Sequence, residues 1–335
     1  MTPRKNHIPT STSLVVARSV DIVAYTPVDS IPAVIQNSGS PAIRAWRDFF
    51  DGTLPNPHTR DVYNRAVRQF FDWCSRENLT LQAISPADVG AYIRQHSGSL
   101  PSVKQHVSAI RRYFNLLVER HIVLMNPAAV ARPPRYTVVE GKTPEITRDQ
   151  IKELLGAIDR TSLIGLRDFA IFTTLIYTAT RAGAACKLKL RDFRYSDRQM
   201  VLRFTEKRGK SREIPVRHDL EGYIHEYLEA AGLLEGTPAT PIFQTTLRRT
   251  GTLTGRPMRV QDVCRMMKRR LKNAGLPSHL SPHSFRVATI TNLLSQGIER
   301  ADVQRLAGHA DARVTALYDR SNRKVIRNVV ERIAL

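Results

Sequence analysis

Cysteine is scarce in this sequence of 335 residues. The three cysteines, Cys74, Cys186 and Cys264, are odd in number and far apart, and no Cys-x-x-Cys pair or nearby histidine gives them the spacing of zinc ligands. This pattern argues against a disulfide framework and against a structural zinc site. We interpret all three cysteines as packing residues.

Long hydrophobic runs are also missing. The most apolar stretch, residues 169–179, contains three threonines and runs into Arg181, and it is shorter than the about 20 residues that a membrane span needs. The apolar patch at residues 14–17 stops at Arg18, well short of the about 7 to 15 apolar residues of a signal peptide. We therefore expect a cytoplasmic protein without membrane contact.

Acidic residues are outnumbered by basic ones. The chain has 51 lysines and arginines against 30 aspartates and glutamates, which gives a formal net charge of +21. A surplus of this size predicts a polyanionic partner, and nucleic acid is favoured over a membrane surface. With 42% hydrophobic and 24% charged residues the composition is that of a globular protein, and the length favours two domains.

Helical periodicity divides the first part of the chain. Residues 1–38 show none, and we expect an arm there rather than a domain. Residues 39–130 contain four segments with apolar residues on one face, which predict a compact, basic helical bundle. Residues 131–142 include Pro133-Pro134 and Gly141, a composition typical of an interdomain linker. The four helical segments begin near Ser40-Pro41, Thr59, Ser85-Pro86 and Val103.

Residues 143–335 are predicted to form a second domain that is mainly α-helical with a small β-sheet. Thr147 can cap its first helix, and the apolar stretch 166–177 predicts a buried helix. Two β-prone segments, Gln199–Thr205 and Arg212–Val216, flank a polar turn and predict a hairpin. The remainder is interpreted as helices interrupted at glycines.

One short motif suggests phosphate chemistry. His283 and Arg286 are three residues apart, so on a helix they share a face. An arginine offers a fork of donors to phosphate oxygens, and a histidine can carry or accept a proton near neutral pH. The motif alone is weak, because a surface pair without function would give the same pattern.

Further motifs give His283 and Arg286 a context. Gly308-His309 precedes Tyr318 by nine residues, the predicted buried helix ends at Arg181, and the predicted hairpin turn contains lysines. In this order the residues resemble the tyrosine recombinases of the phage-integrase and Xer type. The resemblance implies an N-terminal helical core-binding domain, here residues 39–130, and an α+β catalytic domain. It runs from about residue 43 to the C-terminus and includes residues 102–111 with Asn126-Pro127.

The resemblance also implies roles for individual residues. Tyr318 is then the nucleophile that forms a 3′-phosphotyrosyl link and frees a 5′-hydroxyl. Lys207 protonates the leaving oxygen, although Lys210 competes for that role, and counting back from Pro215 favours Lys207. The implied catalytic set is Arg181, Lys207, His283, Arg286, His309 and Tyr318. Neither a metal nor a nucleotide cofactor is expected.

The implied partner is double-stranded DNA with a specific core site, gripped by both domains. Lys104, Arg111 and Arg112 are candidate DNA contacts in the first domain. Strand exchange through a Holliday junction implies a homotetramer, with accessory proteins as further candidates. The apolar stripe of residues 322–335 predicts a short tail helix that docks on a neighbouring subunit, or on its own domain.

Two positions depart from the family pattern, and two other functions compete. Ala184 stands where an acidic residue often follows the first arginine, and Val287 stands where a histidine often follows the second. These departures concern how Arg181 is supported. The competing hypotheses are a DNA-binding or architectural protein that does not cut, and a relaxing enzyme similar to type IB topoisomerases.

Overall fold

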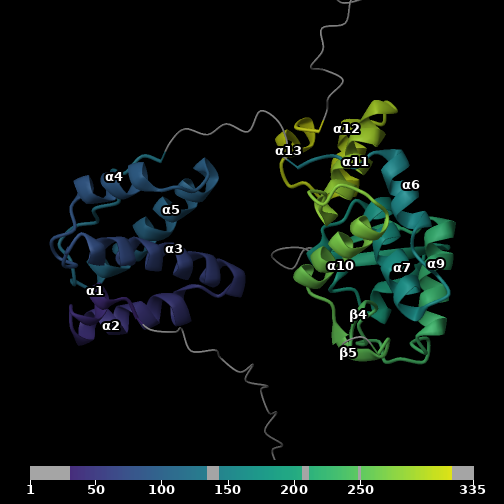
Figure 1. Ribbon diagram of the computed structural model, residues 1–335, viewed down its shortest axis with the longest axis horizontal. Helices are drawn as coiled ribbons and strands as arrows, with labels where there is room; N and C mark the ends of the chain where they lie inside the picture. Colours follow the sequence, from purple (N-terminus) through teal and green to yellow (C-terminus); the bar gives the residue numbers. More distant parts are fainter. Residues whose placement is uncertain (1–30, 134–142, 206–210, 248–249, 319–335) are drawn as a thin grey trace, which may run out of the picture. The chain divides into compact units, whose positions relative to one another are not determined.

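The chain folds into two compact units, divided between residues 137 and 138. In this computed structural model the structure describes residues 31–133, 143–205, 211–247 and 250–318 (Figure 1). Each unit has its own hydrophobic core and is described by itself. No helix among these residues combines the length and the apolar character needed to cross a membrane.

The described part of the first unit is entirely helical. Its four long helices match the four predicted segments, although α2 is preceded by Gly39 and begins at Ser40, so Ser40 is not its N-cap as predicted. A short helix, α1, lies within the predicted arm and buries Val34 and Ile35 in the core of this unit. The ordered core therefore begins ahead of residue 39. The elements are α1 (Ala33–Gln36), α2 (Ser40–Arg47), the π-helical η1 (Asp48–Thr53), α3 (Pro57–Arg76), α4 (Pro86–Gln95) and α5 (Leu100–Glu119).

Local capping and aromatic packing explain these helices. The Asn56 side chain accepts hydrogen bonds from the first amides of α3, and Ser85 forms a reciprocal capping box with Asp88 at the start of α4. Fully buried aromatic rings from α2, η1, α3 and α5 interlock in the centre, with Trp46 4.6 Å from Phe50 between ring centroids. Large aromatic surfaces thus supply most of the core of this small unit.

The second unit combines helices with two small antiparallel sheets. The first sheet has the strand order β1-β2-β3, and β2 and β3 are the predicted hairpin. The second sheet, β4-β5, was not predicted from the sequence. The elements of the second unit are α6 (Arg148–Gly156), α7 (Leu163–Thr178), α8 (Ala182–Ala185), the 3₁₀-helical η2 (Leu190–Asp192), β1 (Phe193–Ser196), β2 (Gln199–Thr205), β3 (Ser211–Pro215), α9 (His218–Ala230), β4 (Gln244–Thr246), β5 (Leu253–Pro257), α10 (Val260–Asn273), α11 (Pro282–Ser295), α12 (Arg300–Ala307) and α13 (Ala312–Ala316).

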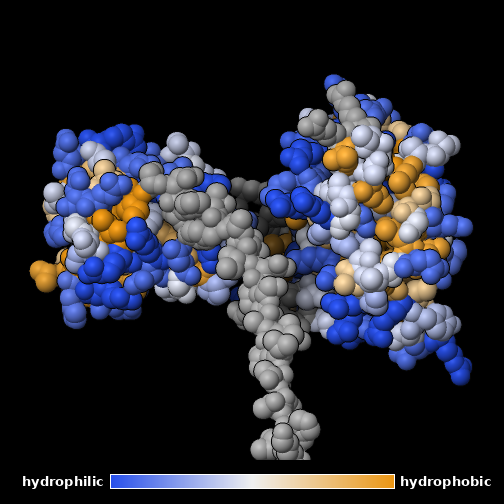
Figure 2. All heavy atoms as spheres, turned by 90° about the horizontal axis from the view of Figure 1, so that it is seen from below, coloured by the Kyte–Doolittle hydropathy of each residue, from blue (hydrophilic) through white to orange (hydrophobic). Residues whose placement is uncertain are grey.

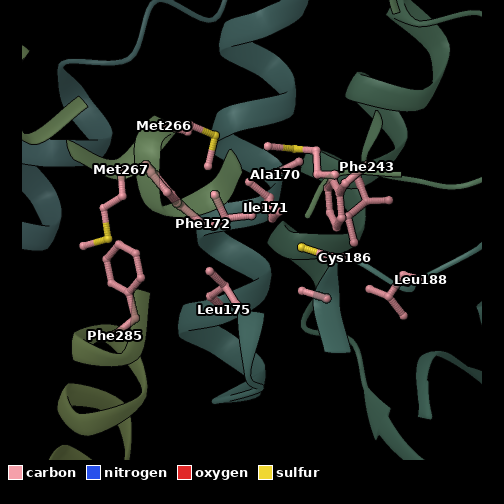
Figure 3. Close-up of a cluster of buried hydrophobic side chains, with 14 of the residues drawn as sticks. Ala170, Ile171, Phe172, Leu175, Cys186, Leu188, Phe243, Met266, Met267 and Phe285 are labelled. Atoms are coloured by element: carbon pink, nitrogen blue, oxygen red, sulfur yellow. The ribbon is translucent and has the colours of Figure 1, made fainter. Parts of the chain in front are cut away.

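Helix α7 forms the centre of the second unit. Its residues Phe172 and Leu175 are fully buried, and Phe172 lies 5.4 Å from Phe285 of α11 between ring centroids (Figure 3). Met266 and Met267 of α10 complete this side of the core, as Figure 3 shows. The core therefore fixes α11 against α7, and these two helices lead to the predicted catalytic residues. Hydrophilic residues cover most of the visible surface of each unit (Figure 2).

Candidate active site

The C-terminal end of α7 presents the first arginine of the predicted site. Thr178 is the last residue of the helix, and Ala179 ends it in the left-handed conformation with φ of 47°. This conformation is unfavourable for a residue with a Cβ atom, so it persists only where the surroundings enforce it. Ala179 is completely buried, whereas Arg181 two residues later is exposed. The sharp helix end thus carries the chain from the core to an exposed cation.

The first turn of α11 holds the second arginine. Ser281 and Ser284 form a reciprocal capping box, and His283 lies in the same turn. Arg286 is 1% exposed, and its Nη1 and Nη2 atoms donate to the carbonyls of Ala179 and Ala307, the latter at 2.7 Å. The guanidinium is thereby fixed between the end of α7 and the end of α12. A buried arginine held by two main-chain carbonyls keeps a full positive charge with few ways to move.

Helix α12 ends just before His309, the second histidine of the predicted site. Gly308 adopts a left-handed conformation with φ of 63°, which glycine tolerates without strain and which terminates the helix. His309 follows and is 7% exposed. Its Nδ1 atom lies 2.8 Å from the hydroxyl of Thr315 in α13, and its carbonyl accepts from Gln304 at 3.0 Å. These contacts fix both the backbone and the ring of His309.

Tyr318 lies between the two histidines. Its ring stacks on the His309 ring with centroids 5.7 Å apart and an interplanar angle of 9°. Its hydroxyl lies 3.4 Å from Nε2 of His283. The same tyrosine packs against a small buried cluster that includes Ala179 and Ala307. The hydroxyl is therefore held next to a group that can accept its proton.

The site is strongly cationic, and this affects its histidines. Burial, followed by the charges of Arg286 and Arg181, lowers the pKa of His309 to about 4. The same three causes lower the pKa of His283. Burial and the charge of Arg181 lower the pKa of Arg286 to about 10, which leaves this guanidinium protonated at neutral pH. Tyr318 thus contacts two neutral imidazoles, and the charges of both arginines act on these imidazoles.

The structure therefore brings together five of the six predicted catalytic residues. Arg181, His283, Arg286, His309 and Tyr318 come from the ends of α7, α11, α12 and α13 and interact electrostatically with one another. Lys207 and its competitor Lys210 lie outside the described residues.

The candidate DNA contacts of the first unit differ in their surroundings. Lys104 and Arg112 of α5 are exposed. Arg111 is half-buried and donates from Nε and Nη2 to the carbonyls of Ala128 and Ala131. Those bonds fasten the segment after α5 to the helix, so Arg111 has a structural task inside its own unit.

The two departures from the family pattern are both at least half-buried. Ala184 in α8 is half-buried against the main core, and Val287 in α11 is 3% exposed. Among the described residues, no carboxylate forms an ion pair with Arg181. Main-chain geometry at the end of α7 therefore positions Arg181 in this part of the structure.

Two residues near the site were missed in the sequence. Thr315 is completely buried and holds the ring of His309, and Arg212 of β3 lies close enough to contribute to the lowered pKa of His309. Neither has a sequence signal of its own, because each gains its role from a tertiary contact. In the described ranges no cluster of three histidine, cysteine, aspartate or glutamate side chains could bind a metal ion.

The comparisons with known proteins agree with this geometry. The model of the phage integrase family matches residues 144–324, and the model of the phage integrase N-terminal SAM-like domain matches residues 55–121. Tyrosine recombinase XerC of Anoxybacillus flavithermus is 28% identical over 283 residues, 81% of this chain and 90% of XerC. Tyrosine recombinase XerD of Ralstonia nicotianae is 27% identical over 303 residues, 87% of this chain and 93% of XerD.

Solved structures show the same fold. A lambda integrase from a tetramer bound to a Holliday junction has a TM-score of 0.61 and 19% sequence identity, with 85% of this chain and 79% of the integrase chain covered. At this identity the likeness concerns the fold. The family match, in contrast, spans more than half of the sequence and contains all six predicted catalytic positions. The chain belongs to the phage integrase family and is a tyrosine recombinase.

Proposed function

We propose that this protein is a site-specific DNA recombinase in which Tyr318 cuts one DNA strand by attacking a phosphodiester. The supporting observation is the Tyr318 hydroxyl 3.4 Å from Nε2 of His283, beside the buried Arg286 guanidinium. His283 accepts the phenolic proton as the tyrosine oxygen bonds to phosphorus. The 5′-oxygen leaves, and the 3′-phosphate remains on the enzyme as a phosphotyrosine.

The cations stabilise the charge that develops on the phosphate. Arg181 and Arg286 donate to its non-bridging oxygens, and His309 donates through Nε2, since Nδ1 faces Thr315. Removing one donor of this kind from a preorganised site costs about 3 to 4 kcal/mol of transition-state stabilisation. Because Arg286 is already fixed by two carbonyls, little reorganisation is needed when the charge appears.

The leaving 5′-oxygen needs a proton, and Lys207 supplies it, with Lys210 as the alternative donor. The phosphotyrosine retains the energy of the broken phosphodiester. A 5′-hydroxyl from another duplex then attacks the phosphorus, and the tyrosine leaves and regains its proton. This sequence is balanced without a nucleotide or a metal ion.

The proposed assembly is a homotetramer on double-stranded DNA that carries a specific core site, in the cytoplasm. The lambda integrase tetramer bound to a Holliday junction supports this arrangement because its chain has the same fold. Residues 322–335 are proposed to dock on a neighbouring subunit. Lys104 and Arg112 are proposed to contact the DNA backbone, and Arg111 contributes charge beside them.

A nicked suicide substrate tests the proposal. Cleavage near the nick releases a short 5′-hydroxyl fragment that diffuses away, so the wild-type protein accumulates a covalent DNA adduct. Tyr318→Phe should bind the same DNA and form no adduct. Tyr195→Phe, which alters an exposed tyrosine in β1, is the matched control and should cleave normally.

The competing functions predict different results. A DNA-binding protein that does not cut would trap no adduct in any variant. A topoisomerase-like enzyme would relax supercoiled DNA without a sequence preference and without forming tetramers. Either result would overturn the proposal.

A further inference from the structure

One arginine joins the β2–β3 hairpin to the end of α12. Arg212, the second residue of β3, donates from Nη1 to the carbonyl of Arg305 at 3.3 Å. Its guanidinium also lies over the ring of Phe204, its register partner on β2, at 5.9 Å from the ring centroid. The side chain is half-buried. Two elements that are 93 residues apart in sequence are thus connected at this point.

The end of α12 receives two guanidinium groups. The last carbonyls of a helix have no partner within the helix and carry partial negative charge, so they attract cations. Arg286 from α11 donates to the carbonyl of Ala307. Arg212 adds a second hydrogen bond to the carbonyl of Arg305, which also accepts from the amide of Gly308 at 3.1 Å. Gly308 and His309 follow directly after α12 in the chain. Arg212 therefore stabilises the helix end from which His309 enters the site.

The hairpin ends close to this contact. Thr205 and Ser211 are the last residues in register on β2 and β3, and they flank residues 206–210. Arg212 is adjacent to Ser211. Fixing Arg212 on α12 therefore fixes the base of the turn that contains the proposed proton donor Lys207.

Arg212 also acts electrostatically on the active site, although its side chain is held at the edge of that site. Its charge contributes to the lowered pKa of His309, after burial and the charges of Arg286 and Arg181. It also contributes to the lowered pKa of Arg286, after burial and the charge of Arg181. A cation at this position could alternatively bind the phosphate itself. The bond to Arg305 and the contact with Phe204 favour an anchoring role, because they hold the guanidinium against the protein.

We propose that Arg212 is a positioning residue that anchors strand β3 on the last turn of α12 and so fixes Ser211, from which the chain enters the turn with the proposed proton donor. This inference rests on the proposed function. It assigns to Arg212 an effect on the departure of the 5′-oxygen and no contact with the phosphate.

A change of leaving group separates these two roles. In a suicide substrate with sulfur in place of the bridging 5′-oxygen, the leaving thiolate needs no proton, since a thiol has a pKa near 8.5. Arg212→Met keeps the apolar stem and removes the donors. We expect it to cleave the oxygen substrate at least tenfold more slowly than wild type and the sulfur substrate within about threefold of wild type. The cleavage rate of Arg212→Lys on the oxygen substrate should lie between those of wild type and Arg212→Met, because a lysine can still donate to the carbonyl.

The controls cover charge, binding and folding. Arg198→Met removes an exposed arginine from the turn between β1 and β2 and should leave both rates unchanged. Gel shifts check that DNA binding is preserved, and circular dichroism checks folding. If Arg212→Met does not fold, Arg212→Lys carries the test, because a slower oxygen rate with a normal sulfur rate is expected for it too.

Each remaining outcome overturns one specific claim. Equal slowing of Arg212→Met on both substrates would show that Arg212 acts on the phosphate, and normal cleavage of both would show that the anchor is dispensable. Lys207→Ala serves as the reference for loss of the proton donor. If sulfur does not restore its cleavage, the role of Lys207 in the proposed function fails, independently of Arg212.

Discussion

At the residue scale, the site depends on small contacts that fix side chains at the ends of helices. Arg286 is held by two carbonyls, and His309 is held by Thr315 through its Nδ1 atom. When the Thr315 hydroxyl donates that bond, the ring proton of neutral His309 resides on Nε2. The threonine thus sets the tautomer that can donate to a phosphate.

Replacement of Thr315 by valine should reduce catalysis more than stability. The change keeps the shape of the side chain and removes the bond to Nδ1 of His309. We expect the single-turnover cleavage rate to fall about 10- to 100-fold, by analogy with the loss of a group that orients a metal-binding histidine. Thr291→Val in α11 is the control, since the Thr291 hydroxyl has no hydrogen-bond partner within the described structure. Equal cleavage by the two variants would contradict this role.

The sequence predicted five of the residues at this scale by motif and order, and the structure places them near one another. It gave no signal for Thr315 or Arg212, because their importance lies in contacts with His309 and with the carbonyl of Arg305. Such contacts depend on which elements end side by side, and that information is absent from local patterns.

At the element scale, buried polar contacts fasten helices whose ends carry function. Asp168 of α7 is completely buried and forms ion pairs with Arg167, Arg269 and Arg270, the last two from α10. This carboxylate joins α7 to α10 in the middle of the catalytic unit. Loss of one partner from a buried charged network leaves the remaining charges uncompensated.

Asp168→Asn should therefore destabilise the catalytic unit by about 3 to 5 kcal/mol. Asp149→Asn, which affects an exposed ion pair with Lys152, should change stability by less than about 1 kcal/mol. Both of the chain's tryptophans, Trp46 and Trp73, lie in the first unit. Urea unfolding followed by circular dichroism at 222 nm reports both units, so a transition without a matching change in tryptophan fluorescence belongs to the catalytic unit. Equal midpoints for the two variants would contradict the prediction.

A buried contact between helices α4 and α5 should make the first unit less stable in acid. His106 of α5 is 7% exposed, and its Nδ1 lies 2.9 Å from the Tyr92 hydroxyl and 3.2 Å from Nε2 of His96. Burial, followed by the neighbouring His96, lowers the pKa of His106 to about 4. The unfolded chain, with a histidine pKa near 6.5, binds this proton more readily than the folded one, so stability is lost as pH falls from about 6.5 to 4.

The expected loss is up to about 3 kcal/mol at pH 4, and tryptophan fluorescence during urea unfolding measures it in the first unit alone. His106→Gln should remove this part of the pH dependence. His58→Gln, an exposed histidine in α3, should keep it. A wild-type protein whose first unit is equally stable at pH 7 and pH 4 would contradict the role of His106.

At the scale of the whole molecule, the proposed function requires more than one chain. The net charge of +21 is suited to binding DNA, and the family's chemistry joins strands from two duplexes. Residues 322–335 carry the apolar stripe Val325, Ile326, Val329, Val330 and Ile333. The sequence predicts a short helix there, and a helix of that length would be stable only when packed on a host surface.

Deletion of residues 322–335 should therefore abolish tetramers on core-site DNA while leaving Tyr318 and the cleavage residues in the chain. Sedimentation of complexes with a Holliday junction would show this as a shift from tetramer to smaller species. A deletion variant that forms tetramers normally would place the tail on its own subunit instead.

The sequence by itself determined the fold class, the two units and the chemistry, because helical periodicity, net charge and the order of six motif positions are local or additive properties. It did not predict the β4–β5 hairpin, whose strands are short and polar, with left-handed glycines at Gly251 and Gly255. It also did not predict the left-handed end of α7 at Ala179 or the anchoring of Arg286 on it. Only the tertiary structure decided these features. The end of α7 and the bonds of Arg286 depend on backbone carbonyls that come together when α7, α11 and α12 pack, and β4 is bonded to α7 through Arg167, which donates to the carbonyl of Gln244.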